Sequence, residues 1–82
     1  MRVDLFLKQS TILKRRTIAK AYCELGYVKV NSKVVKPSFE VKNDDLVEVR
    51  LGKRKVIAKA VIKTTTKREF ASYELIEVKE NE

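Results

Sequence analysis

Residues 15–31 read RRTIAKAYCELGYVKVN, and within this stretch the hydrophobic period changes from helical to alternating. The first part predicts a helix over 16–25, because apolar side chains recur there at i, i+4 and i+7. The stripe that this helix is expected to bury consists of Ile18, Tyr22 and Leu25. Gly26 follows at a position where helices commonly end in a left-handed residue, so we expect the helix to stop there.

Beyond this glycine, apolar residues alternate with polar ones, which predicts strands. Val28 and Val30 begin a hairpin that is expected to turn at Asn31-Ser32 and return through 33–36. The same alternation, with many β-branched residues, predicts further strands at 47–51, 56–62 and 73–78. The turn residues between these strands favour an antiparallel arrangement.

Upstream of the quoted stretch, Val3, Phe6 and Leu7 recur at helical spacing and predict a first short helix. Near the other end, Thr66 to Glu69 has the capping-box spacing of a short helical turn. The sequence therefore predicts an α+β fold, with two N-terminal helices followed by a small twisted antiparallel β-sheet and a basic hairpin extension.

The charge of the chain favours a polyanion as its partner. The 82 residues hold 19 Lys and Arg against 11 Asp and Glu, a formal net charge of +8. This charge is uneven, because residues 1–25 carry +4, 26–50 carry +1, 51–68 carry +7 and 69–82 carry −4. A basic first third, a basic stretch at 53–68 and an acidic tail indicate one polyanion-binding surface.

Several classes of function are disfavoured by what the sequence lacks. Because the chain has no histidine, it has neither an imidazole base nor an imidazole metal ligand. Cys23 is the single cysteine, which excludes an internal disulfide, and we expect it to be a buried structural thiol. Two isolated glycines cannot form a phosphate-binding loop. Asp44-Asp45 fits a turn better than a catalytic pair of carboxylates. We therefore expect no enzymatic activity, no cofactor and no metal.

The sequence also bears on location. The longest uncharged stretch, 9–13, is too short to span a membrane, and the N-terminal residues lack the apolar region of a signal peptide. We therefore expect a cytoplasmic protein that binds no membrane. A membrane-surface binder remains an alternative, but it needs an apolar face beside the basic one, whereas the apolar side of 16–25 is expected to face a core.

Two nearby segments, 15–20 (RRTIAK) and 26–31 (GYVKVN), resemble the S4-type RNA-binding domain. The match continues through Val34, Lys36-Pro37-Ser38, Val41 and Asp45-Leu46-Val47-Glu48-Val49. Two positions depart from the family pattern, since Arg15 stands where Ser is usual and Ser32 where Gly is usual. The resemblance implies the S4, or αL, RNA-binding fold over residues 1–51, with 52–82 as a C-terminal β extension of the same domain ending in an acidic tail.

The opening residues, MRVDLFLKQSTILKRRTIAK, are similar to the bacterial RqcP family of small stand-alone S4 proteins. That similarity implies a monomeric ribosome-quality-control factor that binds large-subunit rRNA and peptidyl-tRNA on obstructed large ribosomal subunits. It also implies that the factor stabilises the tRNA while a partner, RqcH, adds C-terminal alanine tails. The alternatives are a stand-alone S4 protein acting on another structured RNA or in ribosome assembly, and a catalytic subunit or enzyme fragment.

Basic side chains in and around the two predicted helices are the candidates for RNA contacts. The arginines lead, because arginine binds phosphate in bidentate fashion, and the lysines add point charges. These candidates are Arg2, Lys8, Lys14, Arg15, Arg16 and Lys20. Further candidates are Lys53, Arg54 and Lys55, although charge is also typical of a turn. Phe6 and Tyr22 fit a core better than base stacking. Recognition by RNA shape and backbone, with a steep salt dependence, is expected.

Overall fold

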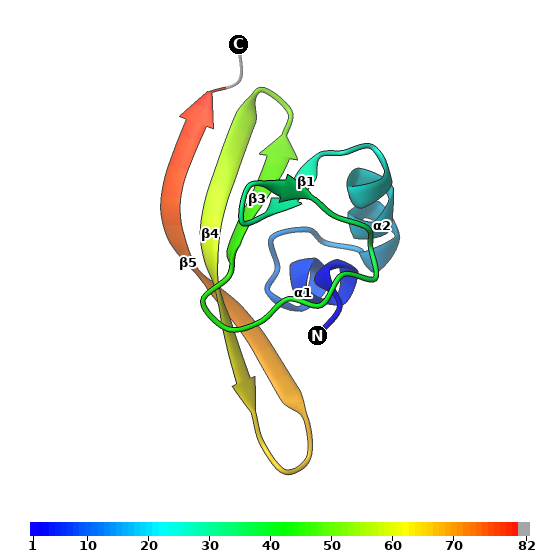
Figure 1. Ribbon diagram of the computed structural model, residues 1–82, viewed down its shortest axis with the longest axis vertical. Coiled ribbons are helices and arrows are strands. Elements are labelled where there is room, and N and C mark those ends of the chain that lie inside the picture. The colour runs from blue at the N-terminus through cyan, green and yellow to red at the C-terminus, as the bar shows by residue number, and fades with distance from the viewer. Residues whose placement is uncertain (81–82) are drawn as a thin grey trace.

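The computed structural model describes residues 1–80 and places two helices against one face of a five-stranded antiparallel sheet (Figure 1). The strands are arranged in the order β2-β1-β3-β4-β5. The elements are α1 (Val3–Gln9), α2 (Arg16–Glu24), β1 (Val28–Val30), β2 (Lys33–Val34), β3 (Leu46–Leu51), β4 (Arg54–Thr64) and β5 (Glu69–Glu80). The predicted α+β class, both helices and every predicted strand are confirmed.

The buried face of α2 differs from the predicted stripe. Ile18 and Leu25 are 39% and 62% exposed, so the prediction that these two face the core is wrong. Tyr22 is half-buried and packs against the core, as predicted. The buried residues of α2 are Ala19 and Cys23. Because α2 packs against both α1 and β1, small side chains at these two positions let the backbones approach closely, and the larger side chains lie at the margins of the contact.

The core lies between the helices and the sheet. Phe6 and Leu7 of α1 are fully buried against inward-facing strand residues such as Val47 and Ala60. The position of Phe6 confirms its prediction as a core residue rather than a base-stacking one. Since strand side chains alternate, a second set of residues lies on the opposite face, which neither helix covers. We call this set the open sheet face; it includes Lys29, Glu48, Lys55 and Lys59.

The turn between β1 and β2 forms where the sequence predicts it. Asn31 and Ser32 both have positive φ, 51° and 71°, as in the type I′ turns that favour hairpins. The Asn31 side chain also holds the turn onto the next strand, because its Oδ1 accepts the Leu46 N–H at 3.0 Å and its Nδ2 donates to Asp45 at 3.1 Å. This contact fixes the edge of the sheet nearest α2.

The turn between β4 and β5 is not helical, so the predicted helical turn at 66–69 is wrong. Thr65 closes a tight turn instead, since its Oγ1 accepts the N–H groups of Lys67 and Arg68 at 3.3 and 3.2 Å. The Thr65 hydroxyl satisfies donors that a helix would have satisfied with carbonyls. The acidic segment up to Glu80 belongs to β5 rather than to a tail, and residues 81–82 lie outside the described residues.

The basic stretch at 53–68 does not form a single patch, because it follows β4 from end to end. Eleven residues of strand span roughly 35 Å. Lys53 lies at the β3–β4 turn and Arg68 at the β4–β5 turn, which Figure 1 shows at opposite ends of the molecule. Within residues 1–80, no helix has the length and apolar character required to cross a membrane.

Candidate nucleic-acid interface

Arg2 precedes α1 at a point where the backbone is fixed from several sides. The Met1 ammonium group donates to Glu40 Oε1 at 2.7 Å, and the Val41 N–H donates to the Met1 carbonyl at 2.8 Å. Arg2 itself pairs with Glu40 in an isolated antiparallel bridge. These contacts hold the Arg2 backbone in place while its side chain remains half exposed.

Asp4 is a buried carboxylate shared by two arginines. Its side chain is 3% exposed, and its Oδ2 accepts a hydrogen bond from Arg2 Nη2 at 3.1 Å. Its Oδ1 lies 3.5 Å from Arg16 Nη2 and accepts the Leu5 N–H at 2.7 Å. A buried carboxylate needs such partners to offset its desolvation. One side chain in the core thereby orients two guanidinium groups at the surface.

Arg2, Arg16 and Lys20 line a shallow cavity of about 280 Å³ together with Asp4 and Thr17. We call this cavity the arginine site. Its three cations face one carboxylate, so the site keeps a positive surplus that is available to an external anion. No side chain caps the N-terminus of α2, which begins here. Oriented guanidinium groups with free donors suit the bidentate binding of phosphate oxygens.

Lys8 and Lys14 lie at the other end of α1, away from the arginine site. α1 has seven residues, so its two ends are roughly 10 Å apart. The two lysines line a second cavity of about 570 Å³, which we call the hairpin site because the tip of the β4–β5 hairpin completes it. Its remaining lining residues are Gln9, Thr11, Arg68, Glu69, Phe70 and Ala71.

The structure thus divides the predicted RNA contacts into two groups. Arg15 is exposed immediately before α2 and lines neither of the two cavities. Among the lining residues that sequence reasoning missed, Asp4, Arg68 and Phe70 matter most for the chemistry of these sites. Of these, Arg68 and Phe70 carried a usable signal, because an arginine and an aromatic residue two positions apart follow a predicted strand.

The N-terminal half of the molecule also matches a known family. The S4 domain family matches residues 1–47, which include both helices and the β1–β2 hairpin. The chain belongs to the S4 domain family. The resemblance noted in the sequence is therefore confirmed. The S4 match contains the whole arginine site, whereas the hairpin site combines S4 residues with residues beyond position 47.

Similar proteins within this family carry a common name, RQC P-site tRNA stabilizing factor. The one from Streptococcus pneumoniae is 43% identical, covering 93% of this chain and 90% of its own length. Those from Halalkalibacterium halodurans and Bacillus subtilis are 43% and 41% identical, covering 100% and 88% of this chain and 93% and 85% of their own lengths. These relatives confirm the resemblance to the RqcP family.

A solved S4-fold structure is similar as well. The trimeric structure of Vibrio cholerae heat shock protein 15 aligns with a TM-score of 0.77 and 25% identity, covering 93% of this chain and 81% of that chain. This alignment extends well beyond the 47 residues of the S4 match and therefore includes the later strands. The expectation that the present chain is a monomer stays a prediction.

The further candidates Lys53, Arg54 and Lys55 lie at the β3–β4 turn, outside the S4 match. Lys55 Nζ lies 3.7 Å from Glu48 on the open sheet face, and Lys29 lies 3.9 Å from the same carboxylate. Such partly exposed pairs add little stability, but they cancel charge locally. This end of the molecule is therefore a weaker candidate for binding RNA than the arginine site.

Cys23 lies on the buried side of α2, behind the arginine site. Burial, together with smaller contributions from the nearby Asp4 and Glu24 carboxylates, raises the pKa of its thiol to about 11. At neutral pH the thiol is therefore protonated and a poor nucleophile. This agrees with the prediction of a structural cysteine.

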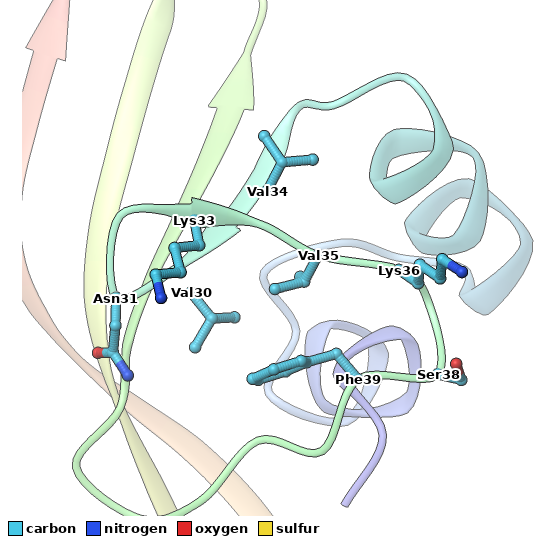
Figure 2. A pocket seen from close by; sticks show the side chains of 8 residues that line it. All are labelled: Val30, Asn31, Lys33, Val34, Val35, Lys36, Ser38 and Phe39. Atoms are coloured by element: carbon cyan, nitrogen blue, oxygen red, sulfur yellow. The ribbon is translucent and has the colours of Figure 1, made fainter.

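A third cavity, of about 570 Å³, lies beside the β1–β2 hairpin and contains none of the predicted site residues. Figure 2 shows Val30, Val35 and Phe39 around one space, while the Lys36 side chain extends away from it. Val30 and Val35 are buried, so this hollow is the outer margin of the core. Its lining includes two lysines, Lys33 and Lys36, but no arginine, so it lacks the bidentate phosphate donors of the arginine site.

Proposed function

We propose that this protein is a non-enzymatic ribosome-quality-control factor that binds RNA. In this proposal it recognises large ribosomal subunits obstructed by peptidyl-tRNA, contacts large-subunit rRNA and the tRNA, and stabilises the tRNA in the P site. Membership of the S4 family and the shared name of the relatives support it. The observation that carries it is the pair Arg2 and Arg16, oriented by Asp4 at the surface.

The arginine site suits RNA because structured RNA is recognised mainly through its backbone and shape. Each guanidinium group can present two donors to one phosphate, and hydrogen bonds to charged groups contribute about 1.5–3 kcal/mol each. Since Asp4 already orients both side chains, binding loses less side-chain freedom than it would with unrestrained arginines. Lys20 adds attraction without demanding a fixed geometry.

A finer part of the proposal concerns the step that the tRNA serves. The factor holds the tRNA on the large subunit in the cytoplasm while the partner RqcH directs the addition of C-terminal alanine residues. The name of the relatives, which specifies the P-site tRNA, supports this part. The protein contributes binding and positioning, and the arginine site needs no catalytic group for that purpose.

Co-sedimentation with obstructed large subunits tests the proposal. The double variant Arg2→Ala/Arg16→Ala is expected to bind about 100-fold more weakly, since it loses two charge-assisted contacts of about 1.5 kcal/mol each. The matched control is Lys55→Ala/Lys59→Ala, which removes the same charge from the open sheet face and is expected to bind almost normally. Circular dichroism confirms that each variant is folded.

Two results would contradict the proposal. Normal co-sedimentation of the folded Arg2→Ala/Arg16→Ala variant would show that the arginine site does not bind the subunits. Equal losses of binding in both double variants would show that only net charge matters. RNA cross-links that fall mainly outside large subunits would instead favour the alternative, an S4 protein that acts on another structured RNA or in ribosome assembly.

A further inference from the structure

The hairpin site is built from two parts of the chain that are distant in sequence. Lys8 and Lys14 come from the end of α1 and the loop after it, while Arg68 and Phe70 come from the tip of the β4–β5 hairpin. The latter two lie beyond residue 47, where the S4 match ends. The cavity of about 570 Å³ falls in the range of about 300–1,000 Å³ that is typical of small-ligand sites.

The cations of this site are left without carboxylate partners. Within residues 1–80, Lys8, Lys14 and Arg68 form no salt bridge. Lys59 on the open sheet face, by contrast, lies within 4 Å of two carboxylates. Only one acidic residue, Glu69, lines the cavity, so the hairpin site keeps a positive surplus for an external anion.

An exposed aromatic ring lies beside one of these cations, Arg68. The Arg68 Cζ lies 4.8 Å from the centroid of the Phe70 ring, and Phe70 is 45% exposed. Hydrogen bonds to Thr65 fix the backbone that carries Arg68. A guanidinium group stacked on a phenyl ring presents a flat surface, and RNA-binding proteins use such surfaces to stack unpaired bases.

We propose that the hairpin site binds an unpaired nucleotide of RNA. Lys8 and Lys14 contact its phosphate, and its base stacks on the surface formed by Arg68 and Phe70. The nucleotide must be unpaired, because a base inside a duplex already has both faces stacked on its neighbours. This inference rests on the proposed function and names a second RNA contact, at the opposite end of α1 from the arginine site.

The arrangement gives the two sites different tasks. The arginine site offers oriented phosphate donors and no exposed aromatic ring among its lining residues, which suits a helical backbone. The hairpin site adds a stacking surface, which suits a loop or bulge. With roughly 10 Å between the ends of α1, one RNA can reach both sites when a helical segment lies next to an unpaired nucleotide.

Fluorescence titration with short RNAs tests this proposal on the whole 82-residue chain. One probe is an RNA stem-loop with 2-aminopurine in its loop, and the other is a duplex of equal length with 2-aminopurine in a base pair. The wild type is expected to bind the stem-loop about tenfold more tightly and to change the fluorescence of the loop base. Phe70→Leu, which keeps an apolar side chain, is expected to abolish both the preference and the fluorescence change.

Matched variants separate this contact from the rest of the surface. Tyr73→Leu replaces another exposed aromatic residue of β5 that does not line the cavity, and it is expected to behave like the wild type. Arg2→Ala/Arg16→Ala is expected to weaken the binding of both probes by the same factor and to leave the preference for the loop unchanged. A loop preference that survives Phe70→Leu, or that is absent in the wild type, would overturn the inference.

The outcome is distinguishable from failure of the proposed function. If the protein co-sediments with obstructed large subunits through the arginine site but shows no preference for the loop probe, only the hairpin site is refuted. If it prefers the loop probe but does not co-sediment with those subunits, the unpaired-nucleotide site is supported and the proposed ribosomal function is refuted.

Discussion

Asp4 in the helical layer and Glu48 on the open sheet face each pair with two basic side chains, but under different conditions. Asp4 is 3% exposed and lies 3.1 and 3.5 Å from the guanidinium groups of Arg2 and Arg16. Glu48 is 20% exposed and lies 3.7 and 3.9 Å from the ammonium groups of two lysines. The buried carboxylate orients planar donors, whereas the more exposed one mainly cancels charge.

The comparison shows that the net charge of +8 does not by itself locate an interface. What matters is whether the structure leaves cations oriented and available or pairs them off. The helical layer does the first at the arginine site, and the open sheet face does the second. A test of this difference should therefore neutralise the carboxylates rather than the cations. Neutralising Asp4 or Glu48 changes the net charge by the same +1, so any difference between the two variants reflects the role of the carboxylate.

Of the two carboxylate variants, Asp4→Asn is expected to have the larger effect. Although this variant adds positive charge, its RNA affinity should fall roughly tenfold. The two arginines lose the contact that limits their side-chain freedom, and ordering each of them on binding then costs about 0.5–1.5 kcal/mol. The free energy of unfolding should also fall, by about 1–3 kcal/mol, since a buried charge-assisted hydrogen bond is lost. Titration with the RNA duplex and urea denaturation measure the two quantities.

Glu48→Gln is expected to act in the opposite direction and more weakly. It frees Lys29 and Lys55, so affinity for RNA at low salt should rise roughly twofold, and the logarithm of affinity should fall more steeply with the logarithm of salt concentration. Binding measured over a range of salt concentrations tests this. If Asp4→Asn also raised affinity, the distinction between an orienting and a neutralising carboxylate would be wrong.

The elements of the fold could be predicted because each has a clear period. The change at Gly26 separates a helix from a hairpin, and φ values of 78° at Gly26 and 62° at Gly52 agree with chain reversals there. The choice of buried face on α2 could not be predicted in the same way. Ile18 and Leu25 are more hydrophobic than Ala19 and Cys23, but close approach of two helices favours the smaller pair.

The arginine site could be predicted only in part. Arginines on the two helices were candidates because of their chemistry, but the sequence does not reveal that Asp4 is buried between them. For the hairpin site, Lys8 and Lys14 were candidates and Arg68 and Phe70 carried a signal, but their meeting in one cavity could not be predicted, because it depends on how the β4–β5 hairpin turns. With a helical turn at 66–69, as the capping-box spacing suggested, Arg68 and Phe70 would have had a different orientation.

The smallest effect is expected at Cys23, whose thiol reports on the Asp4 charge from the buried side. Burial is the main cause of its raised pKa and Asp4 the next, so Asp4→Asn should lower the midpoint of thiolate formation from about 11 while keeping it above 9.0. Glu48→Gln should leave the midpoint unchanged. The ultraviolet absorbance of the thiolate, followed against pH, measures these midpoints.

The same thiol also makes stability depend on pH. Because its folded pKa lies above its ordinary value of 9.0, the folded state holds the proton that the unfolded state releases, so the free energy of unfolding should fall as pH rises from 9.0 to about 11. Cys23→Ala lacks this contribution but keeps the lysines, which titrate over the same pH range. Subtracting its free energy of unfolding from that of the wild type therefore isolates the contribution of the thiol. The difference should decrease over this range and more gently in an Asp4→Asn background. An equal decrease in both backgrounds would mean that the Asp4 charge does not reach the buried side of α2.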